Sequence, residues 1–368
     1  MKLGPLFISI EGLILTKNDR KNLSSDNVGG VILFSRNYEN KKQLKELIND
    51  IKNIKSPELI ISVDQEGGRI QRFENEFSSL PSLGSIGEMY EDSFPKALEC
   101  AFLAGGVMAI ELSECGVDFS FAPVLDIDHG CSEIIGDRSF HSDYKVVSIL
   151  AEAYVLGTKT QGMISVGKHF PGHGGVALDS HEEMPIDERS IEDLNNDLGP
   201  YRFLSETHLN AIMTAHIQYP NIDENIVTFS EYWLKTILRE ELGFRGLVFS
   251  DDLMMKAIDE KLSIEQKIHK AIFAGCDFVL ICNVESTDMS ILLENLELDY
   301  DNVAMDKKYD ALRCKRNTVP SGEAPLTYCY KRFLAHSLTM INKEERKKVI
   351  KQIEKNLPNV KINDWLNS

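Results

Sequence analysis

Short hydrophobic runs recur along the chain and are separated by longer stretches of mixed character. The runs are LFISIEG (6–12), GVILF (30–34), LIISVDQ (59–65), DFSFAPVLD (118–126), MISVGKHF (163–170), AIMTAHI (211–217), LVFSDD (247–252) and CDFVLICN (276–283). Most of them are continuously apolar, which is typical of strands buried on both faces of a parallel sheet. The pattern therefore predicts eight buried β-strands.

The stretches between these runs have helical spacing. KKQLKELINDIKNI (41–54) places its apolar residues on one helical face, and the same spacing recurs at 95–114, 143–160, 190–206, 229–242, 262–274 and 286–297. Ser190, Ser230 and Ser263 stand where helix N-caps are expected. Alternating strands and helices imply a parallel sheet, and eight such units over somewhat more than the roughly 250 residues typical of the fold predict a (β/α)₈ barrel.

The predicted organisation is an α/β, single-domain (β/α)₈ TIM barrel with a helical C-terminal extension. We assign residues 1–298 to the barrel and 299–368 to an extension packed on it. The segment 299–324 is polar, and helices are expected at 325–340 and 342–356. A doubly wound open sheet is the alternative fold, although no G-x-G-x-x-G motif follows the first strand to indicate a bound dinucleotide.

Composition narrows the range of partners and compartments. The 368 residues carry a formal net charge of −17, which argues against nucleic acid as a partner. The seven cysteines are odd in number and form no CxxC pair, as expected for reduced thiols in the cytoplasm. The N-terminus lacks the features of a signal peptide, and no apolar run reaches the roughly 18 residues of a membrane span. We expect a monomer that binds no membrane.

Polar residues follow nearly every predicted strand. In chain order they are Asp64, Glu66, Arg69, Arg72, Asp126, Asp137, Arg138, Lys168, His169, His216, Ser250, Asp251, Asp252 and Asn283. In a barrel, the C-terminal ends of the strands meet at one rim, where active sites lie. Carboxylates, guanidinium groups and imidazoles together suit the hydroxyls of a sugar. Glycoside cleavage also needs a carboxylate at the anomeric carbon and a group that protonates the leaving oxygen.

Each of these residues also has a structural interpretation. Asp251 and Asp252 could cap a helix, and His216 could be a hydrogen-bonded core histidine. His169, His173 and His181, together with Asp179, could instead bind Zn²⁺. It is their convergence on one rim that favours a sugar-binding active site.

Longer motifs in the chain resemble glycoside hydrolase family 3, in particular its single-domain bacterial cytoplasmic β-N-acetylglucosaminidases. The matching stretches are VDQEGGRIQRF (63–73), FAPVLDI (121–127), IGDRSF (135–140), GKHFPGHGGVALDSH (167–181), MTAHIQYP (213–220) and GFRGLVFSDDLMM (243–255). They stand in the family's order and cover about residues 60–300. The family fold is the (β/α)₈ barrel.

The resemblance implies a role for each matching residue. Asp251 matches the nucleophile, and Asp179 with His181 matches a dyad in which histidine is the general acid/base. The residues that match those binding the non-reducing N-acetylglucosamine are Asp64, Arg72, Arg138, Lys168 and His169. The implied reaction is retaining and needs no metal or other cofactor. The implied substrates are peptidoglycan fragments in which N-acetylglucosamine is β-1,4-linked to anhydro-N-acetylmuramic acid, with or without peptide.

The stretch Lys168–His181 fits this chemistry. An imidazole has an ordinary pKa of about 6.5, so His181 could give and take a proton near neutral pH, with Asp179 fixing its tautomer. We expect the glycines to release the chain into a loop that carries this pair, and His173 to be structural. The functional alternatives are another family-3 enzyme such as a β-glucosidase, a non-catalytic sugar-binding barrel, or a metallohydrolase.

Overall fold

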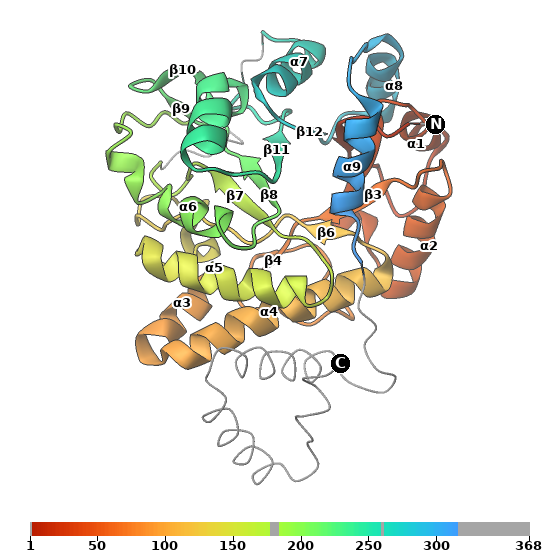
Figure 1. Ribbon diagram of the computed structural model, residues 1–368. Helices are drawn as coiled ribbons and strands as arrows, with labels where there is room; N and C mark the ends of the chain where they lie inside the picture. The colour runs from red at the N-terminus through yellow and green to blue at the C-terminus, as the bar shows by residue number, and fades with distance from the viewer. Residues whose placement is uncertain (1, 177–183, 259–260, 316–368) are drawn as a thin grey trace, which may run out of the picture.

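A closed parallel β-barrel forms the centre of the computed structural model, which describes residues 2–176, 184–258 and 261–315 (Figure 1). Its strands are β1 (Leu6–Ile8), β2 (Val28–Leu33), β3 (Ile60–Val63), β6 (Phe119–Ser120), β7 (Val166–Phe170), β8 (Ala211–Thr214), β11 (Leu247–Asp252) and β12 (Phe278–Ile281). They pair in the order β6-β3-β2-β1-β12-β11-β8-β7. Parallel bridges from Ser120 to Ser165 and from Val124 to Lys168 join the two outer strands. The eight predicted strands are confirmed, and the open-sheet alternative is wrong.

Helices surround the barrel and connect its strands (Figure 1). They are α1 (Lys17–Leu23), α2 (Lys41–Lys52), α3 (Leu83–Asp92), α4 (Phe94–Cys115), α5 (Tyr144–Lys159), α6 (Gly199–Ser205), the π-type helix η5 (Tyr232–Glu241), α7 (Ile264–Ala274) and α8 (Ser286–Asn295). Ser263 caps α7 through its hydroxyl, and the Ser230 hydroxyl accepts from the Trp233 N–H at the start of η5. The pattern missed α1 and α3, of which α1 is short and mostly polar.

Shorter elements lie in the loops between the main strands and helices. They are the ribbons β4 (Gln65–Gly67) with β5 (Ile70–Gln71) and β9 (Gln218–Tyr219) with β10 (Asp223–Ile226), and the single turns η1 (Ser35–Asn37), η2 (Gly136–Arg138), η3 (Asp193–Asn195) and η4 (Val227–Phe229). Two of them position site residues, because β4 carries Glu66 and η2 ends at Arg138.

The barrel interior is packed with aromatic rings. Phe7 lies edge-on to Phe249 and Phe278, with ring centroids 5.4 and 5.5 Å apart, and Phe119 lies 5.6 Å from Phe249. A Cβ atom on Gly30 would stand 2.2 Å from the Phe7 ring, so only glycine fits beside it. The barrel is therefore a solid core that supports side chains at its rim.

A helix absent from the sequence-based prediction, α9 (Asn302–Leu312), covers the base of the barrel. Its Tyr309 is buried, lies 5.1 Å from the Phe278 ring centroid, and donates a hydrogen bond to the Gly4 carbonyl. Lys308 pairs with Asp277 at 2.7 Å. The segment that was expected to begin the extension is thus joined to the first strand of the barrel. The helices expected at 325–340 and 342–356 lie outside the described residues.

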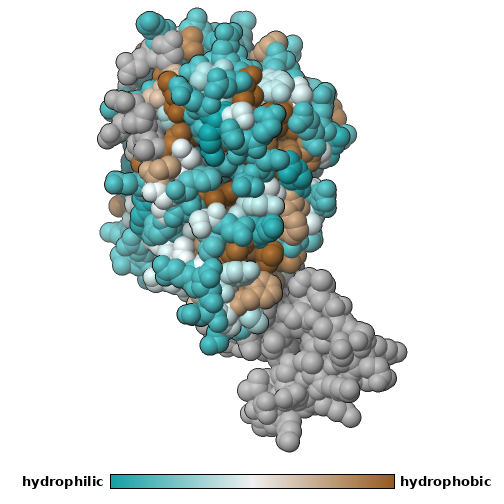
Figure 2. Space-filling model, turned by 90° about the vertical axis from the view of Figure 1, so that its left-hand side faces the viewer, coloured by the Kyte–Doolittle hydropathy of each residue, from teal (hydrophilic) through white to brown (hydrophobic). Residues whose placement is uncertain are grey.

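The surface agrees with the acidic, polar composition. On the face shown in Figure 2, hydrophilic residues prevail and hydrophobic ones form small, separate patches. Within residues 2–176, 184–258 and 261–315, no helix is long and apolar enough to cross a membrane.

Candidate active site

A cavity of about 160 Å³ opens where the barrel strands end at their carboxyl side. Its lining includes six of the eight residues to which the family resemblance gave a catalytic or sugar-binding role, namely Asp64, Arg72, Arg138, Lys168, His169 and Asp251. They come from loops and strand ends that are far apart in the chain. The predicted acid/base pair, Asp179 and His181, falls within residues 177–183, which lie outside the described part of the chain.

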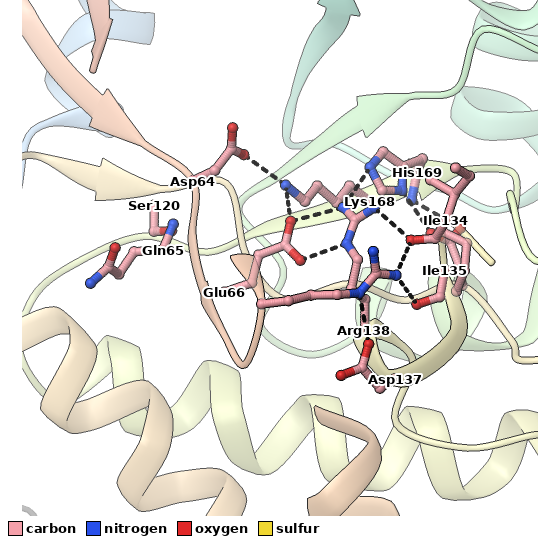
Figure 3. A network of polar contacts seen from close by, with 12 residues as sticks. Asp64, Gln65, Glu66, Ser120, Ile134, Ile135, Asp137, Arg138, Lys168 and His169 are labelled. Atoms are coloured by element: carbon pink, nitrogen blue, oxygen red, sulfur yellow. Dashed lines mark hydrogen bonds and ion pairs between the residues drawn. The ribbon is translucent and has the colours of Figure 1, made fainter. Parts of the chain in front are cut away.

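Glu66 organises the cations of this cavity, as Figure 3 shows. Its two carboxylate oxygens accept hydrogen bonds from Nε and Nη2 of Arg138, both at 2.9 Å, and one of them lies 2.6 Å from Nζ of Lys168. Burial opposes ionisation of Glu66, but Arg138 and Lys168 outweigh it and hold its pKa far below the ordinary value. Sequence reasoning placed Glu66 at the rim without giving it a role.

The Lys168 ammonium group lies between two carboxylates. Its Nζ donates to Oδ1 of Asp64 at 2.8 Å, on the side opposite Glu66 (Figure 3). Burial lowers the pKa of a lysine, but the charges of Asp64 and Glu66 raise the pKa of Lys168 above its ordinary value. Lys168 is therefore a fixed positive charge at the cavity wall.

Asp126 orients the histidine that follows Lys168. Its carboxylate lies 2.7 Å from Nδ1 of His169 and accepts the backbone N–H groups of His169 at 3.1 Å and His173 at 2.8 Å. With Nδ1 donating to Asp126, the other ring nitrogen of His169 is turned toward Arg138, 3.5 Å away. Asp126 is fully buried, and it thereby fixes both the ring and the start of the following loop.

Arg72 presents an unsatisfied donor beside the cavity. Its buried Nε has no hydrogen-bond partner among the described residues, and its Nη2 is 3.9 Å from Oδ2 of Asp64. Buried polar atoms in proteins almost always have partners. An orphan N–H group on a cavity-lining arginine is therefore suited to an acceptor on a ligand.

The two adjacent carboxylates at the end of β11 differ in their surroundings. Asp252 Oδ1 accepts the backbone N–H groups of Met254 at 3.0 Å and Cys282 at 2.9 Å, so it ties the turn to β12. Asp251 Oδ1 accepts only the N–H of Asp252 among the described groups. Burial opposes ionisation of Asp251. The nearby His216, His169 and Lys168, together with the backbone N–H of Asp252, outweigh burial and lower the pKa of Asp251 below its ordinary value. Asp251 is thus an ionised carboxylate facing the cavity.

Two histidines near the site have structural surroundings. His216 is fully buried, with Nδ1 2.8 Å from the Thr228 hydroxyl and Nε2 3.0 Å from the Asp252 carbonyl. Burial lowers its pKa. Burial and the charge of His169 also lower the pKa of His173 to about 4. Both imidazoles are therefore neutral at pH 7, as expected of core histidines.

The loop after β7 begins as a packed segment. The Gly172 carbonyl accepts from the Tyr219 hydroxyl at 2.8 Å, and the Gly174 carbonyl accepts from Sγ of Cys131 at 3.2 Å. A Cβ on Gly174 would stand 1.7 Å from the Ile127 carbonyl oxygen, while Gly172 has a φ of 155°. In residues 171–176 the glycines allow close packing, whereas the sequence had suggested that they release the chain.

The alternative of a metal site depends partly on residues outside the described part of the chain. Among the described residues, no group of three or more His, Cys, Asp or Glu side chains is placed to hold a metal ion. Nδ1 of His169, one of the residues considered as ligands, is bound to Asp126, while Asp179 and His181 lie outside that part of the chain.

Known proteins share this fold and these motifs. The model of the glycosyl hydrolase family 3 N-terminal domain matches residues 7–309. The chain belongs to glycosyl hydrolase family 3. A curated β-hexosaminidase from Nitrosomonas eutropha is 48% identical over 304 residues, covering 82% of this chain and 87% of its relative. Another from Bordetella avium is 42% identical and covers 87% and 97%.

Solved structures agree with this family assignment. NagZ from Neisseria gonorrhoeae, solved in complex with N-trifluoroacetyl-D-glucosamine, has a TM-score of 0.82 and 39% identity, covering 90% of this chain and 97% of that one. A family-3 β-N-acetylglucosaminidase from Paenibacillus has a TM-score of 0.76 and 28% identity over 90% of this chain and 67% of its own. The predicted barrel fold and the resemblance to the family are confirmed, and the protein is a glycoside hydrolase.

Proposed function

We propose that this family-3 hydrolase is a retaining exo-β-N-acetylglucosaminidase. It removes the non-reducing terminal N-acetylglucosamine from peptidoglycan fragments, with or without peptide, in the cytoplasm. The observation that carries the proposal is the ionised Asp251 carboxylate at the wall of a cavity lined by fixed cations. The β-hexosaminidases that the chain resembles support the choice of sugar. The six described cysteines are free thiols, which fits a reducing compartment.

The polar residues of the cavity would hold a single sugar ring. Lys168, Arg138 and Arg72 supply donors, Asp64 supplies an acceptor, and His169 is held in one tautomer by Asp126. The cavity volume of about 160 Å³ is smaller than the roughly 300–1,000 Å³ of pockets for drug-sized ligands. A small pocket with an enclosed, charged wall favours the terminal residue of a chain over an internal one, and so favours exo action.

The chemistry proceeds by double displacement. A carboxylate oxygen of Asp251 attacks the anomeric carbon and forms a covalent glycosyl-enzyme, while the bond to the leaving oxygen breaks. His181 gives its proton to that oxygen, and Asp179 holds the imidazole in position. Water then donates a proton to His181 and its oxygen to the anomeric carbon, which releases the sugar and restores Asp251.

The start of the β7 loop supports this assignment of the acid/base. His173 lines the cavity, and Val176 ends the described part of the loop. His181 follows Val176 by five residues in the sequence, so the loop that begins at the cavity wall leads directly to the proposed acid/base.

A substrate comparison tests the proposed function. The family resemblance implies a pocket for the 2-acetamido group, and a site built to bind an amide discriminates strongly against its absence. We therefore expect the protein to hydrolyse 4-nitrophenyl N-acetyl-β-glucosaminide with a kcat/KM at least about 100-fold above that for the matching β-glucoside. Equal rates on the two substrates would instead indicate a general β-glucosidase. Binding of the sugar without turnover would indicate a non-catalytic barrel.

Matched variants identify the nucleophile in the same assay. Asp251→Asn should lose turnover by a factor of about 10³ or more, whereas Asp252→Asn should retain more activity, because Asp252 is occupied by backbone N–H groups. A 5-fluoro glycosyl fluoride of N-acetylglucosamine should label Asp251 in the wild-type protein. An adduct on Asp252 would overturn this assignment.

A further inference from the structure

Gln65 is a buried residue beside the cavity to which the mechanism gives no role. It stands between Asp64 and Glu66, which both line the cavity, and it is only 1% exposed. Side chains alternate in direction along an extended strand, so a side chain between two that line the cavity is directed away from it. Figure 3 shows this arrangement, with Gln65 on the side of Ser120 and apart from Glu66. Gln65 therefore belongs to the scaffold behind the cavity wall.

The amide of Gln65 binds the backbone of a later part of the same ribbon. Its Oε1 accepts the backbone N–H groups of Arg72 at 2.9 Å and Phe73 at 3.1 Å, and its Nε2 donates to the Phe73 carbonyl at 2.9 Å. The backbone N–H of Gln65 donates at 2.9 Å to the hydroxyl of Ser120, which lies on the barrel strand β6. Gln65 thus ties the backbone of Arg72 to the barrel.

Arg72 depends on this backbone anchor more than the other cations of the cavity do. Arg138 and Lys168 are held through their side chains, by ion pairs with Glu66 at 2.9 Å and 2.6 Å. The side chain of Arg72 is held more loosely, with its Nη2 3.9 Å from Oδ2 of Asp64. Its buried Nε has no hydrogen-bond partner in the part of the chain that the structure describes. The position of the Arg72 guanidinium is therefore set mainly by where its backbone is held.

A second buried glutamine in the same ribbon offers a matched comparison. Gln71, on the partner strand β5, donates from Nε2 to the carbonyls of Phe73 and Ser78, both at 3.0 Å. Its Oε1 accepts the backbone N–H of Leu80 at 3.0 Å. These bonds hold the loop that follows Arg72, whereas the Gln65 amide binds Arg72 itself. The two glutamines therefore separate general order in the ribbon from the placement of one arginine.

We propose that Gln65 is a positioning residue for Arg72, and that its amide sets how tightly the cavity binds the sugar. The inference rests on the proposed function, because it takes Arg72 to contact the terminal N-acetylglucosamine. Gln65 itself touches no substrate. It holds the Arg72 backbone so that the free N–H of the guanidinium meets an acceptor on the sugar.

A double-mutant cycle between Gln65 and Arg72 tests this role. Gln65→Met keeps the bulk of the side chain but removes the amide. It should raise KM for 4-nitrophenyl N-acetyl-β-glucosaminide about tenfold, as for the loss of one hydrogen bond to a charged group, with kcat within about threefold of the wild type. In the Arg72→Ala background the same change should alter KM less than about twofold. The Kd of N-acetylglucosamine, measured by calorimetry, should follow the same pattern.

Gln71→Met is the matched control. It should lower the free energy of unfolding about as much as Gln65→Met does, because each change removes a buried amide that makes three hydrogen bonds. It should change KM less than about twofold in either background. If Gln65→Met does not fold, Gln65→Asn, which withdraws the amide by one methylene, repeats the cycle with the same expected result.

Three outcomes would overturn the proposal. One is an equal effect of the Gln65 change with and without Arg72, which would show that it acts through the general order of the fold. The second is an equal rise in KM in Gln71→Met. The third is an unchanged KM in the Gln65 variant or in Arg72→Ala. A wild-type protein that hydrolyses neither this glycoside nor the matching β-glucoside would instead contradict the proposed function itself.

Discussion

At the level of single residues, the site is built from buried charges that are held by opposite charges. Glu66 joins Arg138 to Lys168, and Asp126 holds His169. Removing one member of such a buried pair leaves the other uncompensated, at a cost of roughly 3–5 kcal/mol. These residues therefore fix the geometry of the cavity wall independently of a ligand.

The titration of His173 should contribute to the acid sensitivity of the fold. The folded pKa of about 4, with His169, Asp126 and Asp251 as its charged neighbours, lies below the roughly 6.5 of an unfolded histidine. Between these values only the unfolded chain binds the proton, so stability falls as pH falls from 6.5 to 4, by up to about 3 kcal/mol. In His173→Gln, denaturant unfolding at pH 7, 6 and 5 should show a shallower decline. A decline equal to that of the wild type would contradict this account.

At the level of secondary-structure elements, the loop after β7 begins as a packed segment and leads in the sequence to the proposed acid/base pair. Arg189 contributes to this packing, because it pairs with Asp197 at 3.0 Å and with Asp187 at 2.7 Å. A Cβ on Gly175 would stand 2.1 Å from its guanidinium. The described residues on both sides of positions 177–183 are therefore held by close packing and buried ion pairs.

The role of His181 should depend on the leaving group. A sugar alcohol needs a proton to depart, whereas dinitrophenolate departs without one. His181→Ala should therefore lower kcat/KM on a disaccharide such as N,N′-diacetylchitobiose by at least about 100-fold, because general acids contribute ~10²–10⁴-fold. On a dinitrophenyl glycoside the loss should be much smaller. Asp179→Ala should show a milder form of this pattern, and His173→Ala should affect both substrates alike. A response of His181→Ala that is flat across aryl glycosides of graded leaving-group pKa would exclude the acid role.

At the level of the entire protein, α9 closes the end of the barrel opposite the site. Tyr309 stacks near Phe7 and Phe278 and reaches the carbonyl of Gly4, while the backbone N–H of Lys315 donates to Gly162 at 2.9 Å. The end of the described chain thus binds both the first strand and the segment that precedes β7. Stability and catalysis are assigned to opposite ends of the barrel.

Tyr309 should matter for stability and little for turnover. Tyr309→Ala removes a fully buried ring and should lower the free energy of unfolding by about 3–5 kcal/mol, as for other large-to-small aromatic substitutions. Tyr309→Phe keeps the ring and should cost only about 1 kcal/mol for the lost hydrogen bond. Denaturant unfolding measures both values. At a temperature where the variants are folded, their kcat should match that of the wild type. A strong drop in kcat would show that the end of the barrel covered by α9 is coupled to the site.

The barrel and its polar rim follow from the amino-acid sequence alone. Each strand is a local run of apolar residues buried on both faces, and each major helix has a local periodicity, so neither depends on distant contacts for its signal. Because parallel strands share one direction, the polar residues that follow them must meet at one end of the barrel. For this reason the sequence suffices to place Asp64, Lys168 and Asp251 at the same rim.

The division of work among these polar residues depends on tertiary contacts. Asp252 differs from Asp251 because it accepts the distant N–H of Cys282. Glu66 joins Arg138, 72 residues further along the chain, and the fold leaves Nε of Arg72 buried with a free donor. The same holds for Tyr309, whose short polar helix carries little apolar periodicity but whose ring fills the base of the barrel. Such partnerships arise from packing in three dimensions, which no local pattern records.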